Sequence, residues 1–116
     1  MQADRTTPTR FNVHVAPLAG GGTEVAVYGE LDMATSPRVR DALDSASDAP
    51  GPVVIDLRAC EFVDSTGIGM LAGVAVRLRE ADRALVLRGL KPRILRTFEI
   101  AGLTEATSIT IEPAES

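Results

Sequence analysis

The sequence predicts an α/β fold in which a mixed, mainly β-sheet core carries helices packed against it, in the order β-β-α-β-α-β-α-β. Short β-branched runs alternate along the chain with longer segments whose apolar residues recur every three to four positions, as strands and crossover helices do. Only Gly20-Gly21-Gly22 and a few flanking residues separate the first two strand-like runs, which fits an antiparallel hairpin. At 116 residues the chain has room for one domain, spanning 1–116 with an ordered core over about 10–112.

The N-terminal half is predicted to form this hairpin and then a helix. The run 11–17 alternates apolar with polar or small residues, which is the period of a half-buried strand, and the segment 23–29 has the same period. Thr35 or Ser36 can then cap a helix with Pro37 in its first turn. The apolar positions that continue this helix at i, i+3, i+4 and i+7 are Val39, Ala42, Leu43 and Ala46.

The C-terminal half is predicted to alternate strands and helices. Residues 53–57 form a β-branched run bounded by proline, which is typical of a central strand buried on both faces. A long amphipathic helix over 66–81 precedes a short buried strand over 84–88. A third helix ends before Gly102, and the alternation at 109–111 indicates a last, edge strand. The apolar face of the long helix consists of Ile68, Leu71, Ala72, Ala75 and Leu78.

Composition restricts the class of protein. No apolar run approaches the roughly 20 residues that span a bilayer, and the first ten residues lack the core of a signal peptide, so we expect a cytoplasmic protein without membrane binding. The net charge of −4 and the dispersed basic residues argue against nucleic acid. The single cysteine, Cys60, excludes an internal disulfide and a cysteine-rich metal site, and we expect it to be a small core hydrophobe. No metal or cofactor is expected.

The segment Asp64-Ser65-Thr66-Gly67-Ile68-Gly69, at the start of the long helix, carries most of the information in the sequence. It resembles the signature of STAS domains, specifically of the bacterial anti-sigma factor antagonists, in which a hydrophobic strand precedes Asp-Ser-Thr/Ser-Gly-hydrophobic-Gly. Gly29-Glu30-Leu31-Asp32 and the segment 94–103 resemble two further elements of that family. The resemblance extends over nearly all of 11–111 and implies the STAS fold.

The resemblance implies partner switching in transcription regulation. In such a switch the unphosphorylated antagonist binds a serine-kinase anti-sigma factor and so releases a sigma factor, for example in a stress response. At the matching position, Ser65 would be the phosphoserine that ends this binding, with Thr66 as the second choice. A separate serine phosphatase would reset the switch, and the kinase and its nucleotide belong to the partner.

The position of Ser65 at a helix start supports this assignment independently of the resemblance. A serine there can accept hydrogen bonds from the unpaired amides of the first turn. A phosphate there would lie at the positive end of the helix, so modification can change the surface without unfolding the domain. Asp64 either orients the Ser65 hydroxyl, contacts the kinase, or caps the turn.

A docking strip for the partner is expected on the same helix. Gly67, Gly69 and Gly73 each cost up to about 1 kcal/mol relative to alanine in a helix, which the close approach of another backbone would explain. A helical wheel places Gly69, Met70, Gly73 and Arg77 outside the core stripe, facing either a partner or a neighbouring element of the same chain. The loop acids Glu30 and Asp32 are expected either to contact the partner or to be solvated. The expected partner-binding residues are therefore Asp64, Thr66, Gly67, Gly69, Met70, Gly73, Arg77, Glu30 and Asp32.

An enzyme is not expected. The only histidine, His14, lies on the first predicted strand with its side chain exposed, and no Gly-x-Ser-x-Gly motif surrounds Ser65. Two alternatives keep the fold but change the module, namely a STAS subunit of a lipid transporter and a component of a signalling scaffold assembly. A pull-down separates the three hypotheses, because each predicts a different prey: a kinase-type anti-sigma factor, a transporter ATPase, or other STAS proteins.

Overall fold

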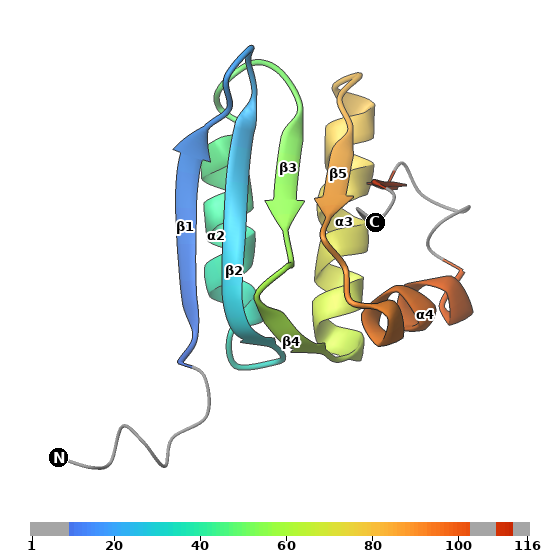
Figure 1. The fold of residues 1–116 in the computed structure, drawn as a ribbon. Coiled ribbons are helices and arrows are strands. Elements are labelled where there is room, and N and C mark those ends of the chain that lie inside the picture. The colour runs from blue at the N-terminus through green and yellow to red at the C-terminus, as the bar shows by residue number, and fades with distance from the viewer. Residues whose placement is uncertain (1–9, 103–108, 113–116) are drawn as a thin grey trace, which may run out of the picture.

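The computed structural model describes residues 10–102 and 109–112, and within these ranges six strands form a mixed sheet in the order β1-β2-β3-β5-β6, with β4 paired to the end of β2 (Figure 1). The strands are β1 (Asn12–Pro17), β2 (Thr23–Leu31), β3 (Val53–Asp56), β4 (Cys60–Val63), β5 (Leu85–Arg88) and β6 (Ile109–Ile111). The helices are α2 (Ser36–Ala46), α3 (Ser65–Glu80) and α4 (Pro92–Ile100). β1 and β2 run antiparallel and the other pairs run parallel, as connections through helices require.

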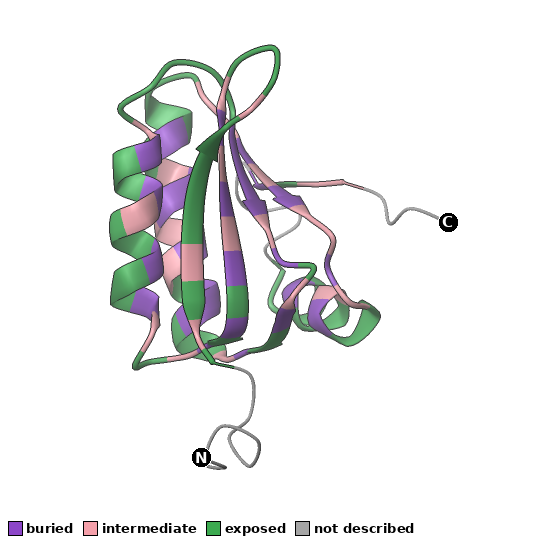
Figure 2. Cartoon of the chain, turned by 60° about the vertical axis from the view of Figure 1, so that its left-hand side comes forward, coloured by how far each residue is buried: buried purple, intermediate pink, exposed green. Residues whose placement is uncertain are grey.

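The core lies between the sheet and the two helices α2 and α3, which cover the same face (Figures 1 and 2). Val25, Ile55 and Leu87 are neighbours in register on β2, β3 and β5, and all three side chains are fully buried toward these helices. The third helix, α4, buries Ile94 and Phe98 in the same core from its place beyond the carboxyl end of β5. The predicted α/β class, hairpin, buried central strand and three helices are confirmed.

Two features of the sheet differ from the prediction. β1 is less buried than its period suggests, and Val15 is 49% exposed. The strand forms an edge of the sheet, where a single neighbour shields it. The predicted order lacks β4. In the structure the two central residues of this strand are exposed, so the segment does not alternate between buried and exposed positions. It is a strand through its parallel pairing with the end of β2, where a register shift follows Gly29.

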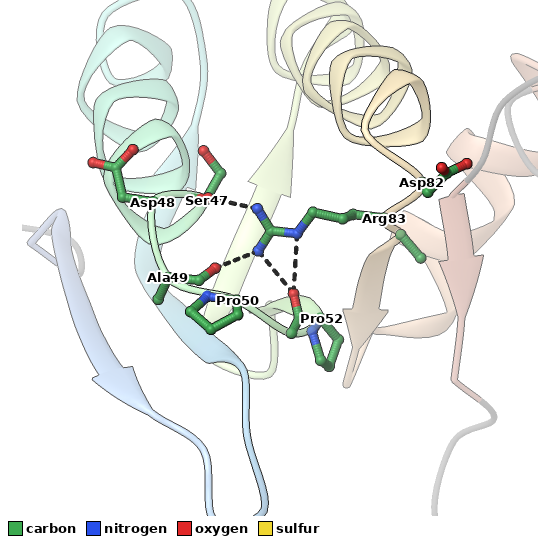
Figure 3. Close-up of a pocket in the computed structure, with 9 residues that line it drawn as sticks. Ser47, Asp48, Ala49, Pro50, Pro52, Asp82 and Arg83 are labelled. Atoms are coloured by element: carbon green, nitrogen blue, oxygen red, sulfur yellow. Dashed lines mark hydrogen bonds between the residues drawn. The ribbon is translucent and has the colours of Figure 1, made fainter.

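Arg83 fastens the loop that follows α2 to the start of β5 (Figure 3). Its guanidinium donates hydrogen bonds to the carbonyl oxygens of Ser47, Ala49 (2.6 Å) and Gly51 (2.8 and 3.2 Å). Ser47 is the C-cap of α2, so the positive charge also meets the negative end of that helix. The loop is thus held at the end of the sheet opposite to α3's first turn.

Replacing Arg83 with alanine should lower the free energy of unfolding by about 2 kcal/mol, because several carbonyls lose charge-assisted hydrogen bonds. Urea denaturation followed by circular dichroism measures the change. Arg83→Lys should recover only part of the loss, since an ammonium group cannot reach the three carbonyls as a planar fork does. Arg79→Ala, at an exposed position nearby in sequence, is the control and should stay within about 0.5 kcal/mol of wild type. An unchanged urea midpoint for Arg83→Ala would contradict this role.

Candidate functional site

Ser65 is the first residue of α3, directly after β4, and its side chain is exposed. Asp64, not Ser65, is the N-cap: its backbone is extended, and its Oδ1 accepts a hydrogen bond of 2.9 Å from the amide of Gly67. The prediction that the Ser65 hydroxyl accepts from the first-turn amides is therefore wrong, because Ser65 already belongs to the helix. Within the described part of the chain its hydroxyl forms no hydrogen bond.

The first turn of α3 is fixed to the sheet by contacts with β2. The amide of Asp64 donates to the carbonyl of Leu31 at 3.0 Å. Gly67 is buried against the same residue: a Cβ atom built on it would lie 2.8 Å from Leu31 Cγ, 3.0 Å from Leu31 O and 3.2 Å from Val63 Cγ1. Gly67 is therefore corrected from a partner-binding residue to a packing residue. The close backbone approach expected at a glycine of this helix occurs here, within the chain.

Asp32 shapes the loop between β2 and α2. Its Oδ1 accepts hydrogen bonds from the amides of Ala34 (3.0 Å) and Thr35 (3.1 Å). The Thr35 hydroxyl donates to the carbonyl of Glu30 at 2.8 Å and accepts from the amide of Asp32 at 2.9 Å. Thr35 stands at the N-cap of α2 but makes no side-chain cap bond, and Ser36 is the first helical residue, so the predicted capping hydroxyl instead ties this loop together. Glu30 is exposed and Asp32 is half-buried.

The predicted docking strip on α3 divides into two sides. Gly69 is exposed, and a Cβ atom on it would meet nothing within 4 Å, while one on Gly73 would meet only Arg77 Nη1 at 3.9 Å. Met70 instead packs partly against the core, and Arg77 Nη2 forms an ion pair of 2.9 Å with Asp44 of α2. Met70 thus lies partly against the core, and Arg77 contacts α2, the neighbouring element of the same chain. The two glycines stay uncovered by the described residues.

Two large apolar side chains that the sequence interpretation did not include lie at this end of the sheet. Met33, in the loop after β2, is 72% exposed, and Phe62 of β4 is 48% exposed. Phe62 is paired in register with Glu30, and the neighbouring pair joins Leu31 to Val63, just before the start of α3. In the sequence, a role of Met33 in this region is indicated by its position directly after the Gly-Glu-Leu-Asp element. Aromatic and methionine side chains are enriched at protein interfaces.

Cys60 and His14 are the two remaining candidate side chains of the sequence. Cys60 is buried, burial raises the pKa of its thiol, and its Sγ donates to the carbonyl of Phe62 at 3.4 Å, which confirms a core role. His14 is exposed on β1, on the side of the sheet away from the helices, with its ring centroid 6.2 Å from that of Tyr28. In the ranges 10–102 and 109–112 no group of His, Cys, Asp and Glu could hold a metal, and no helix is long and apolar enough to cross a membrane.

Comparison with known proteins gives consistent matches. A family model described as "Mlab, STAS domain" matches residues 15–111. The anti-sigma-B factor antagonist of Listeria monocytogenes is 40% identical over 87 residues, which cover 74% of this chain and 76% of that protein. The crystal structure of an anti-sigma factor antagonist from Mycobacterium paratuberculosis is similar with a TM-score of 0.72 at 28% identity, covering 87% of this chain and 86% of that one. The Bacillus cell fate determinant SpoIIAA, solved in its phosphorylated form, has a TM-score of 0.65 at 19% identity over 88% and 92% of the two chains, which shows the same fold.

Proposed function

Because this chain belongs to the STAS-domain family of anti-sigma factor antagonists, which are regulatory proteins and not enzymes, we propose that it is a phosphorylation-controlled partner switch. The unphosphorylated protein binds a serine-kinase anti-sigma factor in the cytoplasm and so releases a sigma factor. The bound kinase phosphorylates Ser65, which ends the binding. A serine phosphatase resets the switch.

The observation that carries this proposal is the geometry at the start of α3. Asp64 supplies the cap, which leaves the Ser65 hydroxyl exposed and unbonded within the described residues. A phosphate on Ser65 would lie at the N-terminus of a 16-residue helix, where the helix dipole favours an anion. The domain can therefore carry the modification without losing its fold, and the change is local to the surface.

The partner would dock on the surface around Ser65. We define this docking face by exposed and half-buried residues of the end of β2, the loop after it, β4 and the outer side of α3: Glu30, Asp32, Met33, Phe62, Ser65, Thr66, Gly69 and Gly73. Met33 and Phe62 give it exposed apolar area. Gly69 and Gly73 lack side chains, so a partner can approach the backbone of α3 closely at these positions. Within the described ranges no other part of this chain lies close enough to either glycine to explain the missing side chain.

Replacing Gly73 with leucine should weaken binding of the anti-sigma factor at least about tenfold while the fold is retained. A Cβ atom at this position meets only the flexible end of Arg77, so the new side chain can project into the docking face without disturbing the core. Leucine is also a better helix former than glycine, so thermal stability should not fall. Isothermal titration calorimetry measures the affinity and circular dichroism the fold. Ser45→Leu, on the exposed surface of α2 near its other end, is the matched control, and equal affinity for both variants would exclude Gly73 from the docking face.

Incubation with purified serine-kinase anti-sigma factors and MgATP, followed by mass spectrometry, tests the proposal directly. One phosphate on Ser65 is expected with the cognate kinase, none is expected on Ser65→Ala, and the phosphate on Thr66→Ala should still map to Ser65. If Ser65 remains unmodified with every anti-sigma factor that binds the protein, the proposed switch is wrong. A phosphate on Thr66 alone would move the switch to the neighbouring residue.

A further inference from the structure

A cleft opens between the first turns of α2 and α3, and Thr66, which follows Ser65 in the chain, lies in its wall. Its volume is about 300 Å³, and its lining residues are Met33, Ser36, Pro37, Arg40, Thr66 and Met70. Ser36 and Arg40 are four residues apart on α2, and Thr66 and Met70 are four residues apart on α3, so each pair lies on one side of its helix. We call this space the α2–α3 cleft.

Two polar groups of the cleft lack partners. Ser36 is only 4% exposed, yet its hydroxyl has no hydrogen-bond partner within the described part of the chain. Arg40 is exposed, and among residues 10–102 and 109–112 its guanidinium forms no hydrogen bond or ion pair. The Ser36 oxygen is closed off from solvent, so the unpaired group of the cleft that an external partner can reach is the guanidinium of Arg40.

The chemistry of the lining selects the arriving group. The guanidinium of Arg40 can only donate hydrogen bonds, and the hydroxyl of the exposed Thr66 can donate as well. No acidic side chain is among the lining residues. Met33 and Met70 supply flexible apolar walls that adapt to the stem of an incoming side chain. A carboxylate on a short apolar stem fits this combination, because it accepts from a guanidinium in a bidentate manner while its methylene groups pack on apolar surface.

We propose that the α2–α3 cleft receives a glutamate or aspartate side chain of the anti-sigma factor, whose carboxylate pairs with Arg40. This inference rests on the proposed function and adds the chemistry of the partner's contact. It also gives the switch an electrostatic cause. Ser65 directly precedes Thr66 of the cleft wall, so a phosphate on Ser65 adds negative charge beside the bound carboxylate and competes with it for Arg40.

Calorimetry with the anti-sigma factor that phosphorylates Ser65, performed without ATP, tests the inference. Arg40→Ala should weaken binding about tenfold and Arg40→Glu about a hundredfold, with a weaker salt dependence than wild type. Arg79→Glu, at the other end of α3, is the matched charge reversal and should bind as wild type does.

Reversing the acidic residues of the anti-sigma factor one at a time identifies the occupant. One such glutamate-to-arginine or aspartate-to-arginine variant should restore affinity for Arg40→Glu. If Arg40→Glu binds as tightly as wild type while Ser65→Asp binds weakly, the cleft inference is wrong and the switch stands. If no acid reversal restores binding, the occupant is not an acidic side chain and the inference is also wrong. If no anti-sigma factor binds the wild-type protein, the proposed function and the inference fail together.

Discussion

Gly67→Ala is expected to lower the free energy of unfolding by about 1–2 kcal/mol, and Gly67→Val by about 3 kcal/mol. The first atom added at this position already lies 2.8 Å from Leu31 Cγ and 3.0 Å from the Leu31 carbonyl oxygen, so β2 or α3 must shift. Leu31 has no room to move, because it is fully buried and pairs in register with Val63. In a helix without this contact, alanine would raise the free energy of unfolding by about 1 kcal/mol relative to glycine. The measured loss is therefore the steric cost of the contact with Leu31 minus that gain.

Gly69→Ala provides the matched comparison two residues further along the same helix. A Cβ atom there meets nothing within 4 Å, so this variant should gain close to 1 kcal/mol in unfolding free energy. Urea denaturation at 25 °C, followed by circular dichroism, measures both variants against wild type. The same substitution is thus expected to change stability in opposite directions at Gly67 and Gly69. Stabilisation at both positions would contradict the packing of α3 on β2.

The contact between Gly67 and Leu31 also explains why the position of Ser65 depends on the core. The Leu31 carbonyl that a Cβ atom on Gly67 would crowd also accepts the hydrogen bond from the amide of Asp64. Asp64 in turn caps the helix through the amide of Gly67. Two residues of the motif, Asp64 and Gly67, are therefore held by Leu31 of β2, and the exposed Ser65 between them is presented from that rigid base.

Local patterns in the sequence were enough to predict most of the elements. The β-branched run from Val53 to Ile55 is buried because it occupies the middle of the sheet, with β2 on one side and β5 on the other. The apolar spacing of 66–81 identified α3, which begins one residue earlier, at Ser65, and ends one residue earlier, at Glu80. Gly102 has the positive φ of +75° expected of the residue that follows a helix end. Each of these features is encoded within a few neighbouring residues.

The features that sequence reasoning missed depend on residues distant along the chain. β4 becomes a strand only because the last residues of β2 lie beside it. The tight packing of Gly67 depends on Leu31, which is 36 positions earlier. A helical wheel sets Gly67 on the side of Leu71 and Gly69 on the other side, but it does not show how closely β2 approaches. The sequence gives no indication of a partner for Arg77. The packing of α2 on α3 brings Asp44 Oδ1 to 2.9 Å from Arg77 Nη2. Periodicity indicates which side of an element is apolar but not what covers the rest.

Phosphorylation of Ser65 is expected to weaken binding of the anti-sigma factor at least about a hundredfold while leaving the domain folded. One unit charge about 5 Å from a partner carboxylate costs about 3 kcal/mol at an effective dielectric of 20, which corresponds to roughly a hundredfold in affinity. A phosphoserine carries about 1.5 to 2 such charges. The fold is spared because the added charge lies in the first turn of α3, where a negative group is favourable by about 0.3–1 kcal/mol.

Calorimetry on the phosphorylated protein and on Ser65→Asp, paired with thermal melts, measures the two halves of this prediction separately. Ser65→Asp should bind weakly and melt no lower than wild type, whereas Ser65→Ala should bind normally and resist the kinase. Ser45→Asp adds the same charge on the exposed surface near the far end of α2, so it reports any effect of net charge alone and should leave the affinity unchanged. The loss at Ser65 should shrink as salt is raised, because the Coulomb part of the repulsion is screened at an exposed site. Normal affinity for Ser65→Asp at low salt would show that a charge at the start of α3 does not control the partner.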